Sequence, residues 1–130
     1  MKTMLILISL LLGSSVYASE KVFFTEPKDQ ATVGQNFHVK MGVEGRKICN
    51  AGQETPDKTC GHHHIIVDGA AMAAGQVLPA DATHLHYGKG QTEADLNLKP
   101  GTHKLTLQFA DFAHRSYGEA LSQTITVNVK

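Results

Sequence analysis

The chain has 130 residues and a balanced charge, with 12 lysine and arginine residues against 12 aspartate and glutamate residues. This length suits a single domain. A chain with no net charge gives no electrostatic reason to expect nucleic acid or an anionic membrane surface as a partner.

The first 18 residues have the pattern of a secretory signal peptide. A basic start at Lys2 precedes an apolar run over residues 4–12, which is too short to span a bilayer. Small residues then lead to Ala18, where we expect cleavage. We therefore predict a periplasmic or secreted protein with no stable membrane insertion. Removing Lys2 leaves 11 basic and 12 acidic side chains in the mature domain, residues 19–130, and a net charge of −1.

Apolar and polar residues alternate through most of the mature chain, as is typical of half-buried β-strands. About seven short antiparallel strands, separated by turns, predict an all-β chain folded as one immunoglobulin-like β-sandwich. The chain has no tryptophan and lacks the widely spaced cysteine pair of antibody domains, so we expect the architecture without membership of that family. The predicted strands cover residues 21–25, 37–43, 62–68, 83–87, 93–98, 103–109 and 125–129.

Both cysteines, Cys49 and Cys60, lie in the mature part. An even number of cysteines in an exported protein predicts a disulfide bond, and closing this short loop would stabilise the fold by about 2–3 kcal/mol. The bond would also fix the chain just before His62 and so preorganise the nearby histidines. The alternative is a pair of thiolate metal ligands, but an oxidising compartment favours the disulfide.

Five of the eight histidines lie in two short segments, and each segment contains a His-x-His pair: His62 with His64, and His84 with His86. Residues i and i+2 of a strand point to the same face, with Cα atoms about 6.5–7 Å apart. Two imidazoles at this spacing can reach one metal ion, and neutral imidazole suits copper(II), zinc and nickel. We therefore predict a site for a copper or zinc ion.

Alternation along the strands predicts the directions of these side chains. In the strand at 62–68, one face carries His63 with two aliphatic residues, and the other carries His62 and His64. The aliphatic face should be buried, and the apolar residues of the strand at 83–87 should be buried likewise. Because burying an imidazole without a partner costs about 1–3 kcal/mol, both His-x-His pairs are predicted to lie on outer faces or at strand ends.

The sequence leaves open whether the two pairs meet. Neighbouring strands of one sheet would bring four imidazoles together, whereas strands in opposite sheets would leave two half-sites, each completed by another side chain such as Asp68, Glu93, His103 or His114. We expect His103 to be a hydrogen-bonded histidine at the start of a strand and His38 to be exposed. The candidate metal ligands are His62, His63, His64, His84, His86 and His114.

Three segments resemble a known family. Residues 61–68, 81–93 and 98–107 are similar to the bacterial family catalogued as domain of unknown function 4399, and the resemblance extends from about residue 39 to residue 129. It implies an exported bacterial protein. Because no activity is established for that family, the resemblance assigns no catalytic role to any residue of this chain. The two cysteines lie outside these motifs.

We predict a metal-binding protein without enzymatic activity. The alternative is an interaction or adhesion module for a protein or glycan partner, in which the histidines are structural hydrogen-bonding groups; a pH sensor is a variant of it. An enzyme is not expected, because the chain has no Gly-x-Ser-x-Gly motif and lacks the signatures of copper/zinc dismutases. A copper oxygenase with a histidine brace would need histidine at the mature N-terminus, where we expect Ser19.

Overall fold

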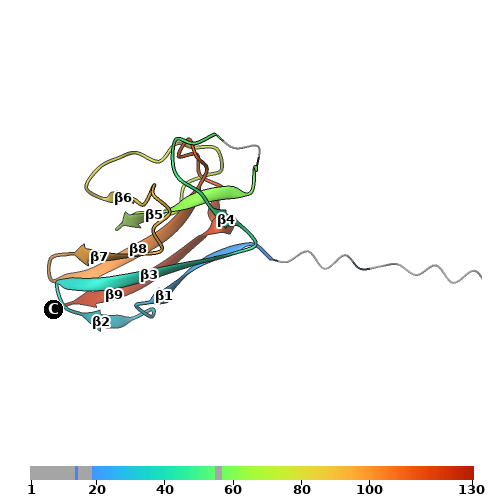
Figure 1. The fold of residues 1–130 in the computed structure, drawn as a ribbon. Helices are drawn as coiled ribbons and strands as arrows, with labels where there is room; N and C mark the ends of the chain where they lie inside the picture. Colours follow the sequence, from blue (N-terminus) through green and yellow to red (C-terminus); the bar gives the residue numbers. More distant parts are fainter. Residues whose placement is uncertain (1–13, 15–18, 55–56) are drawn as a thin grey trace, which may run out of the picture.

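The computed structural model describes residues 14, 19–54 and 57–130. The predicted signal peptide, residues 1–18, lies outside the described residues except for Ser14. The described residues contain nine strands and one short 3-10 helix, η1 (Figure 1). These elements are β1 (Lys21–Glu26), β2 (Ala31–Val33), β3 (Asn36–Glu44), β4 (Lys47–Ile48), β5 (Cys60–Val67), β6 (His84–His86), β7 (Glu93–Asn97), β8 (Gly101–Ala110), η1 (Glu119–Leu121) and β9 (Ser122–Val129).

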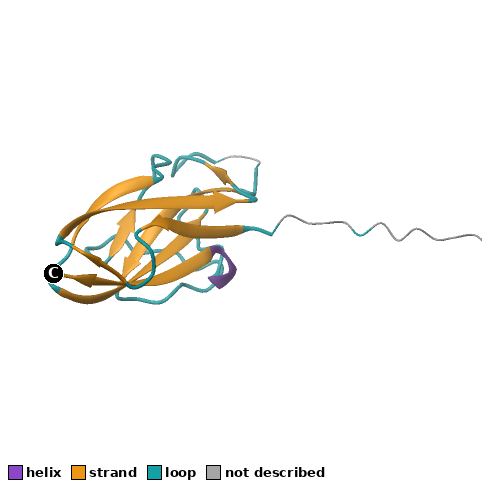
Figure 2. Ribbon diagram, turned by 90° about the horizontal axis from the view of Figure 1, so that it is seen from below, coloured by secondary structure: helices purple, strands orange, loops and turns teal. Residues whose placement is uncertain are grey.

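The strands form two sheets. The smaller sheet has the order β1-β3-β7, and the larger has the order β2-β9-β8-β5-β4, with β6 also paired to β5. All pairings are antiparallel except the two short ones, β2 with β9 and β4 with β5. Figure 2 shows the two sheets joined by loops, with the short helix η1 at one side. The predicted β-sandwich is confirmed, although the described residues contain nine strands where we expected about seven.

The core lies between the two sheets and is built by alternate residues of their strands, as the sequence pattern predicts. The strand residues that face inward are mostly apolar, with His63 of β5 as an exception, and their neighbours face the other way. The core includes Phe37, Val39 and Met41 of β3, Ile65 and Val67 of β5, Leu105, Leu107 and Phe109 of β8, and Ile125, Val127 and Val129 of β9.

The outer face of β5 is buried as well, because the segment after β5 covers it. All eight residues of β5 are buried. On this outer face Ile66 and Ala110 pack with Leu78, and Met72 lies against them. We call residues 69–82, which supply Leu78 and Met72, the covering loop. Among the described residues, no helical segment has the length and apolar character needed to cross a membrane.

Candidate metal centre

Four histidine side chains meet on the outer side of the larger sheet. His62 and His64 belong to β5, His86 belongs to β6, and His114 lies in the turn after β8. Because β5 and β6 are antiparallel neighbours with His64 opposite His86, the two strands bring three of these rings together. The ring centroids of all six pairs lie between 4.7 and 5.7 Å apart. We call these four side chains the histidine cluster.

The ring nitrogens of the cluster point toward one another. The Nε2 atoms of His62 and His64 are 2.9 Å apart, and those of His86 and His114 are 3.1 Å apart. Within the described residues, one nitrogen from each of His62, His86 and His114 lies within 4.8 Å of the other two. Ligand nitrogens in a tetrahedral zinc site are about 3.3 Å from one another, given bonds of about 2.0 Å. These three histidines could therefore hold a metal ion after small movements.

The cluster has a buried floor and an open rim. His62 and His64 are 0% and 1% exposed, whereas His114 is half-buried and His86 is exposed. The direction predicted from strand alternation is confirmed, since His62 and His64 point away from the core. The expectation that unpartnered imidazoles would not be buried there is wrong. The ring centroids of His86 and His114 lie within 5.7 Å of those of His62 and His64, and the covering loop packs on the neighbouring Ile66. An ion would reach the cluster from the side of His86 and His114.

The low pKa values in the cluster favour the neutral form that a metal ligand needs. Burial lowers the pKa of His62 to about 4, and the neighbouring His86 and His114 rings add to this effect. Burial lowers the pKa of His64 to about 3, with further contributions from His62 and His86. The pKa of His86 is also lowered, first by burial and then by His114. These three rings are therefore neutral at pH 7.

A tight turn held by Asp111 places His114. The Asp111 carboxylate accepts hydrogen bonds from the backbone N–H groups of Ala113 and Arg115, at 2.8 and 2.9 Å, and from Arg115 Nε at 2.9 Å. His114 has a φ of 63°, a left-handed conformation that few non-glycine residues adopt. Its carbonyl accepts a hydrogen bond of 2.9 Å from the backbone N–H of Leu78 in the covering loop. The turn therefore fixes both the backbone and the direction of His114.

A glycine makes room for the His86 ring. A Cβ atom at Gly88 would overlap the imidazole of His86, so any larger residue there would displace the ring. The Gly88 carbonyl accepts a hydrogen bond of 2.7 Å from the backbone N–H of Ala51. The position of His86 thus depends on the absence of a side chain two residues further along.

Two of the predicted ligands, His63 and His84, are not part of the cluster. His63 faces the core and packs against Phe109, with ring centroids 5.2 Å apart. Neither of its ring nitrogens has a hydrogen-bond partner among the described residues, and burial lowers its pKa to about 4. His84 turns toward the loop before β6, where its Nδ1 atom lies 2.8 Å from Oδ1 of Asp81.

The other side chains considered as completing ligands also lie elsewhere. Asp68 and His103 pair with each other, with His103 Nδ1 2.8 Å from a carboxylate oxygen of Asp68. Since His103 Nε2 also lies 2.8 Å from the Lys99 carbonyl oxygen, the prediction of a hydrogen-bonded histidine is confirmed. Glu93 contacts His38 at 3.2 Å on the smaller sheet. The side chain of His38 is exposed, as predicted.

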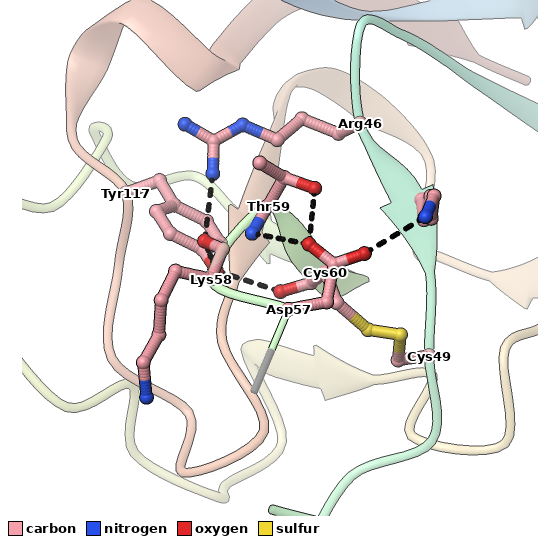
Figure 3. The surroundings of a disulfide bond; sticks show 8 residues. Arg46, Cys49, Asp57, Lys58, Thr59, Cys60 and Tyr117 are labelled. Carbon is pink, nitrogen blue, oxygen red and sulfur yellow. Dashed lines mark hydrogen bonds and ion pairs between the residues drawn. A yellow bond between two sulfur atoms is a disulfide. The ribbon is translucent and has the colours of Figure 1, made fainter. Parts of the chain in front are cut away.

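The predicted disulfide between Cys49 and Cys60 is confirmed, with Cα atoms 5.6 Å apart (Figure 3). The alternative, a pair of thiolate ligands, is therefore wrong. Next to the bond, the Tyr117 hydroxyl donates to the Cys60 carbonyl at 2.6 Å, and the Arg46 guanidinium lies over the Tyr117 ring, 4.4 Å from its centroid. The bond therefore anchors the start of β5, two residues before His62.

The fold and the cluster define a β-sandwich protein with a candidate metal centre on one sheet. The chain belongs to the DUF4399 family, a domain of unknown function, whose family model matches residues 39–130. This match confirms the resemblance and covers all four histidines of the cluster.

No curated protein matches this chain. Among solved structures it is similar to an endo-β-1,4-mannanase from Thermotoga petrophila, with a TM-score of 0.53 and 16% sequence identity over 92% of this chain. The similar region spans only 21% of the mannanase chain. At this identity, the likeness shows the fold alone.

Proposed function

We propose that this protein binds one transition-metal ion, copper or zinc, through the histidine cluster. The observation that carries the proposal is the approach of the ligand nitrogens of His62, His86 and His114 to within 4.8 Å of one another. His64, whose Nε2 atom lies 2.9 Å from that of His62, is available as a fourth ligand.

The chemistry of the donors supports copper or zinc over harder ions. The four cluster side chains offer imidazole nitrogens, whereas magnesium and calcium prefer oxygen ligands. Imidazole suits copper(II) and zinc. The lowered pKa values of His62 and His64 support the same choice, because neutral rings can bind an ion without first losing a proton.

We further propose a role without catalysis, as a metal buffer, sensor or carrier in the periplasm or outside the cell. A rim formed by the exposed His86 and the half-buried His114 supports exchange of the ion with solvent or with another protein. The buried floor of His62 and His64 supports retention of the ion once it is bound.

The test is a titration of chelator-treated protein with copper(II) and with zinc(II), followed by calorimetry and native mass spectrometry. We expect one equivalent of metal and a Kd below about 1 μM, which corresponds to about −8 kcal/mol. His86→Ala and His114→Ala should each weaken binding at least tenfold. His84→Ala is the matched control, because His84 belongs to a His-x-His pair but lies outside the cluster, and it should bind normally. Equal losses in all three variants, or no binding below micromolar, would refute the proposal.

A further inference from the structure

Residues 47–52, which we call the clasp, run beside the start of β5. Lys47 and Ile48 form β4 and pair in parallel with Cys60 and Gly61. The backbone N–H of the next residue, Cys49, donates a hydrogen bond of 2.7 Å to the Gly61 carbonyl. The clasp is thus bonded to the residue that immediately precedes His62.

The end of the clasp reaches the two segments that carry the rim of the histidine cluster. The Ala51 N–H donates to the Gly88 carbonyl at 2.7 Å, and Gly88 lies two residues after His86. The Gly52 N–H donates to the carbonyl of Phe112 at 2.8 Å, two residues before His114. One segment of six residues therefore connects the three parts of the chain that supply His62, His86 and His114.

The disulfide is the covalent anchor of this segment. None of the clasp residues is fully buried, although Ile48 packs against the core as a partly buried side chain. The Cys49–Cys60 bond joins its middle to the start of β5. Cys49 also lines an open surface cavity of about 380 Å³ together with Ile48, Asn50 and Glu54, so a reductant in solvent can approach the bond.

We propose that the Cys49–Cys60 disulfide and the clasp position His86 and His114, so that metal affinity depends on the redox state of the two cysteines. This inference rests on the proposed metal binding. A dithiol reductant would attack one sulfur as a thiolate and form a mixed disulfide, and its second thiol would then release the second cysteine. The disulfide gains two electrons and two protons, the dithiol is oxidised to a disulfide, and the freed clasp no longer holds the two rim segments.

The experiment compares metal binding in the oxidised protein with binding in a double variant, Cys49→Ser with Cys60→Ser. The double variant lacks the bond and also lacks thiols, and it needs no reductant that would itself bind metal. We expect its Kd for copper(II) and zinc(II) to rise at least about tenfold, the range seen when groups that orient metal ligands are removed. Hydrogen exchange at the amides of Ala51 and Gly52 should become faster in the metal-free protein, while exchange at Leu107 in the core stays slow.

A second variant tests the clasp with the disulfide intact. Gly52 has a φ of 76° and open space around it, so Gly52→Ala strains the backbone without a steric clash. Gly101→Ala is the matched control, because Gly101 also has a positive φ, 138°, with no atom closer than 4.0 Å, but begins β8 outside the clasp. We expect weaker metal binding in Gly52→Ala only. NMR signals of the His86 and His114 rings should shift in that variant, and those of His38 should not.

The results separate the two proposals. If the oxidised protein binds metal and the double variant and Gly52→Ala bind it at least tenfold more weakly, the positioning role is supported. If all variants bind equally well, the positioning role is refuted and metal binding stands. If the oxidised protein itself does not bind, both proposals are refuted.

Discussion

The metal-free protein should lose stability as the pH falls from 7 to 5, and His63 should account for a defined part of that loss. His63 is 0% exposed, and its two ring nitrogens lack hydrogen-bond partners among the described residues. Burial lowers its pKa from 6.5 to about 4. At pH values between these two pKa values, His63 binds a proton in the unfolded chain but not in the folded protein. The free energy of unfolding therefore decreases as the solution becomes more acidic.

The size of the effect follows from the pKa shift. One pKa unit corresponds to about 1.4 kcal/mol. Integrating between pH 7 and pH 5, with a pKa of 6.5 in the unfolded chain and about 4 in the fold, gives a loss of about 2 kcal/mol from His63 alone. This is a large share of the total stability of a small domain, about 5–15 kcal/mol. The lowered pKa values of His62 and His64 act in the same direction.

The assay is urea unfolding at pH 7, 6 and 5 with excess chelator, for the wild type and for His63→Leu. Leucine has a similar volume beside Phe109 and cannot be protonated, so the variant should lose about 2 kcal/mol less than the wild type over this range. His38→Gln is the control. Hydrogen bonds that His38 donates to Asp95 and then to Glu93 raise the pKa of His38, so its contribution to stability is present at acid pH and is lost as the pH rises. Removing His38 therefore cannot reduce the loss of stability between pH 7 and pH 5. An unchanged pH dependence in His63→Leu would refute the reasoning.

Three further predictions concern the histidine cluster. Gly88→Ala should displace the His86 ring and weaken zinc binding about 10- to 100-fold in calorimetry; an unchanged Kd would show that the ring tolerates the added methyl group. Asp111→Ala should leave backbone N–H groups of the turn without an acceptor, lower the free energy of urea unfolding by about 1–3 kcal/mol and weaken metal binding through His114. Zinc at 100 times its Kd should raise the free energy of urea unfolding by about 2.7 kcal/mol; in His86→Ala, whose Kd should be at least tenfold higher, the same zinc concentration should raise it by about 1.4 kcal/mol or less.

Most of the fold could be predicted because alternation specifies both strands and faces. All seven predicted strands are present, and β5 turns His63 toward the core and His62 away from it. The two unpredicted strands, β2 and β4, contain three and two residues, too few to show a period of two. The burial of the outer face of β5 could not be predicted, because the covering loop that supplies Leu78 and Met72 has no regular pattern.

The site could be predicted only in part, for reasons that lie in particular side chains. The spacing of His62 and His64 places both rings on one face, and their strand lies next to that of His86. The spacing of two residues also selects His84, but it gives no information about the nearby Asp81. The carboxylate of Asp81 lies 2.8 Å from His84 Nδ1 and keeps that ring outside the cluster. His114 enters the cluster through a left-handed turn, and the local signal for that turn is the Asp111 side chain.

Metal binding and acid sensitivity have the same physical origin in this protein. His62 and His64 are buried, and the Nδ1 atom of each has no hydrogen-bond partner among the described residues. Folding therefore removes polar groups from water and leaves part of their hydrogen-bonding capacity unused, which lowers the stability of the metal-free protein. The same burial keeps the rings neutral and holds their Nε2 atoms 2.9 Å apart. An ion that binds the Nε2 atoms would add stability to the fold without giving the two Nδ1 atoms a partner, and protons at low pH would oppose both the fold and the ion.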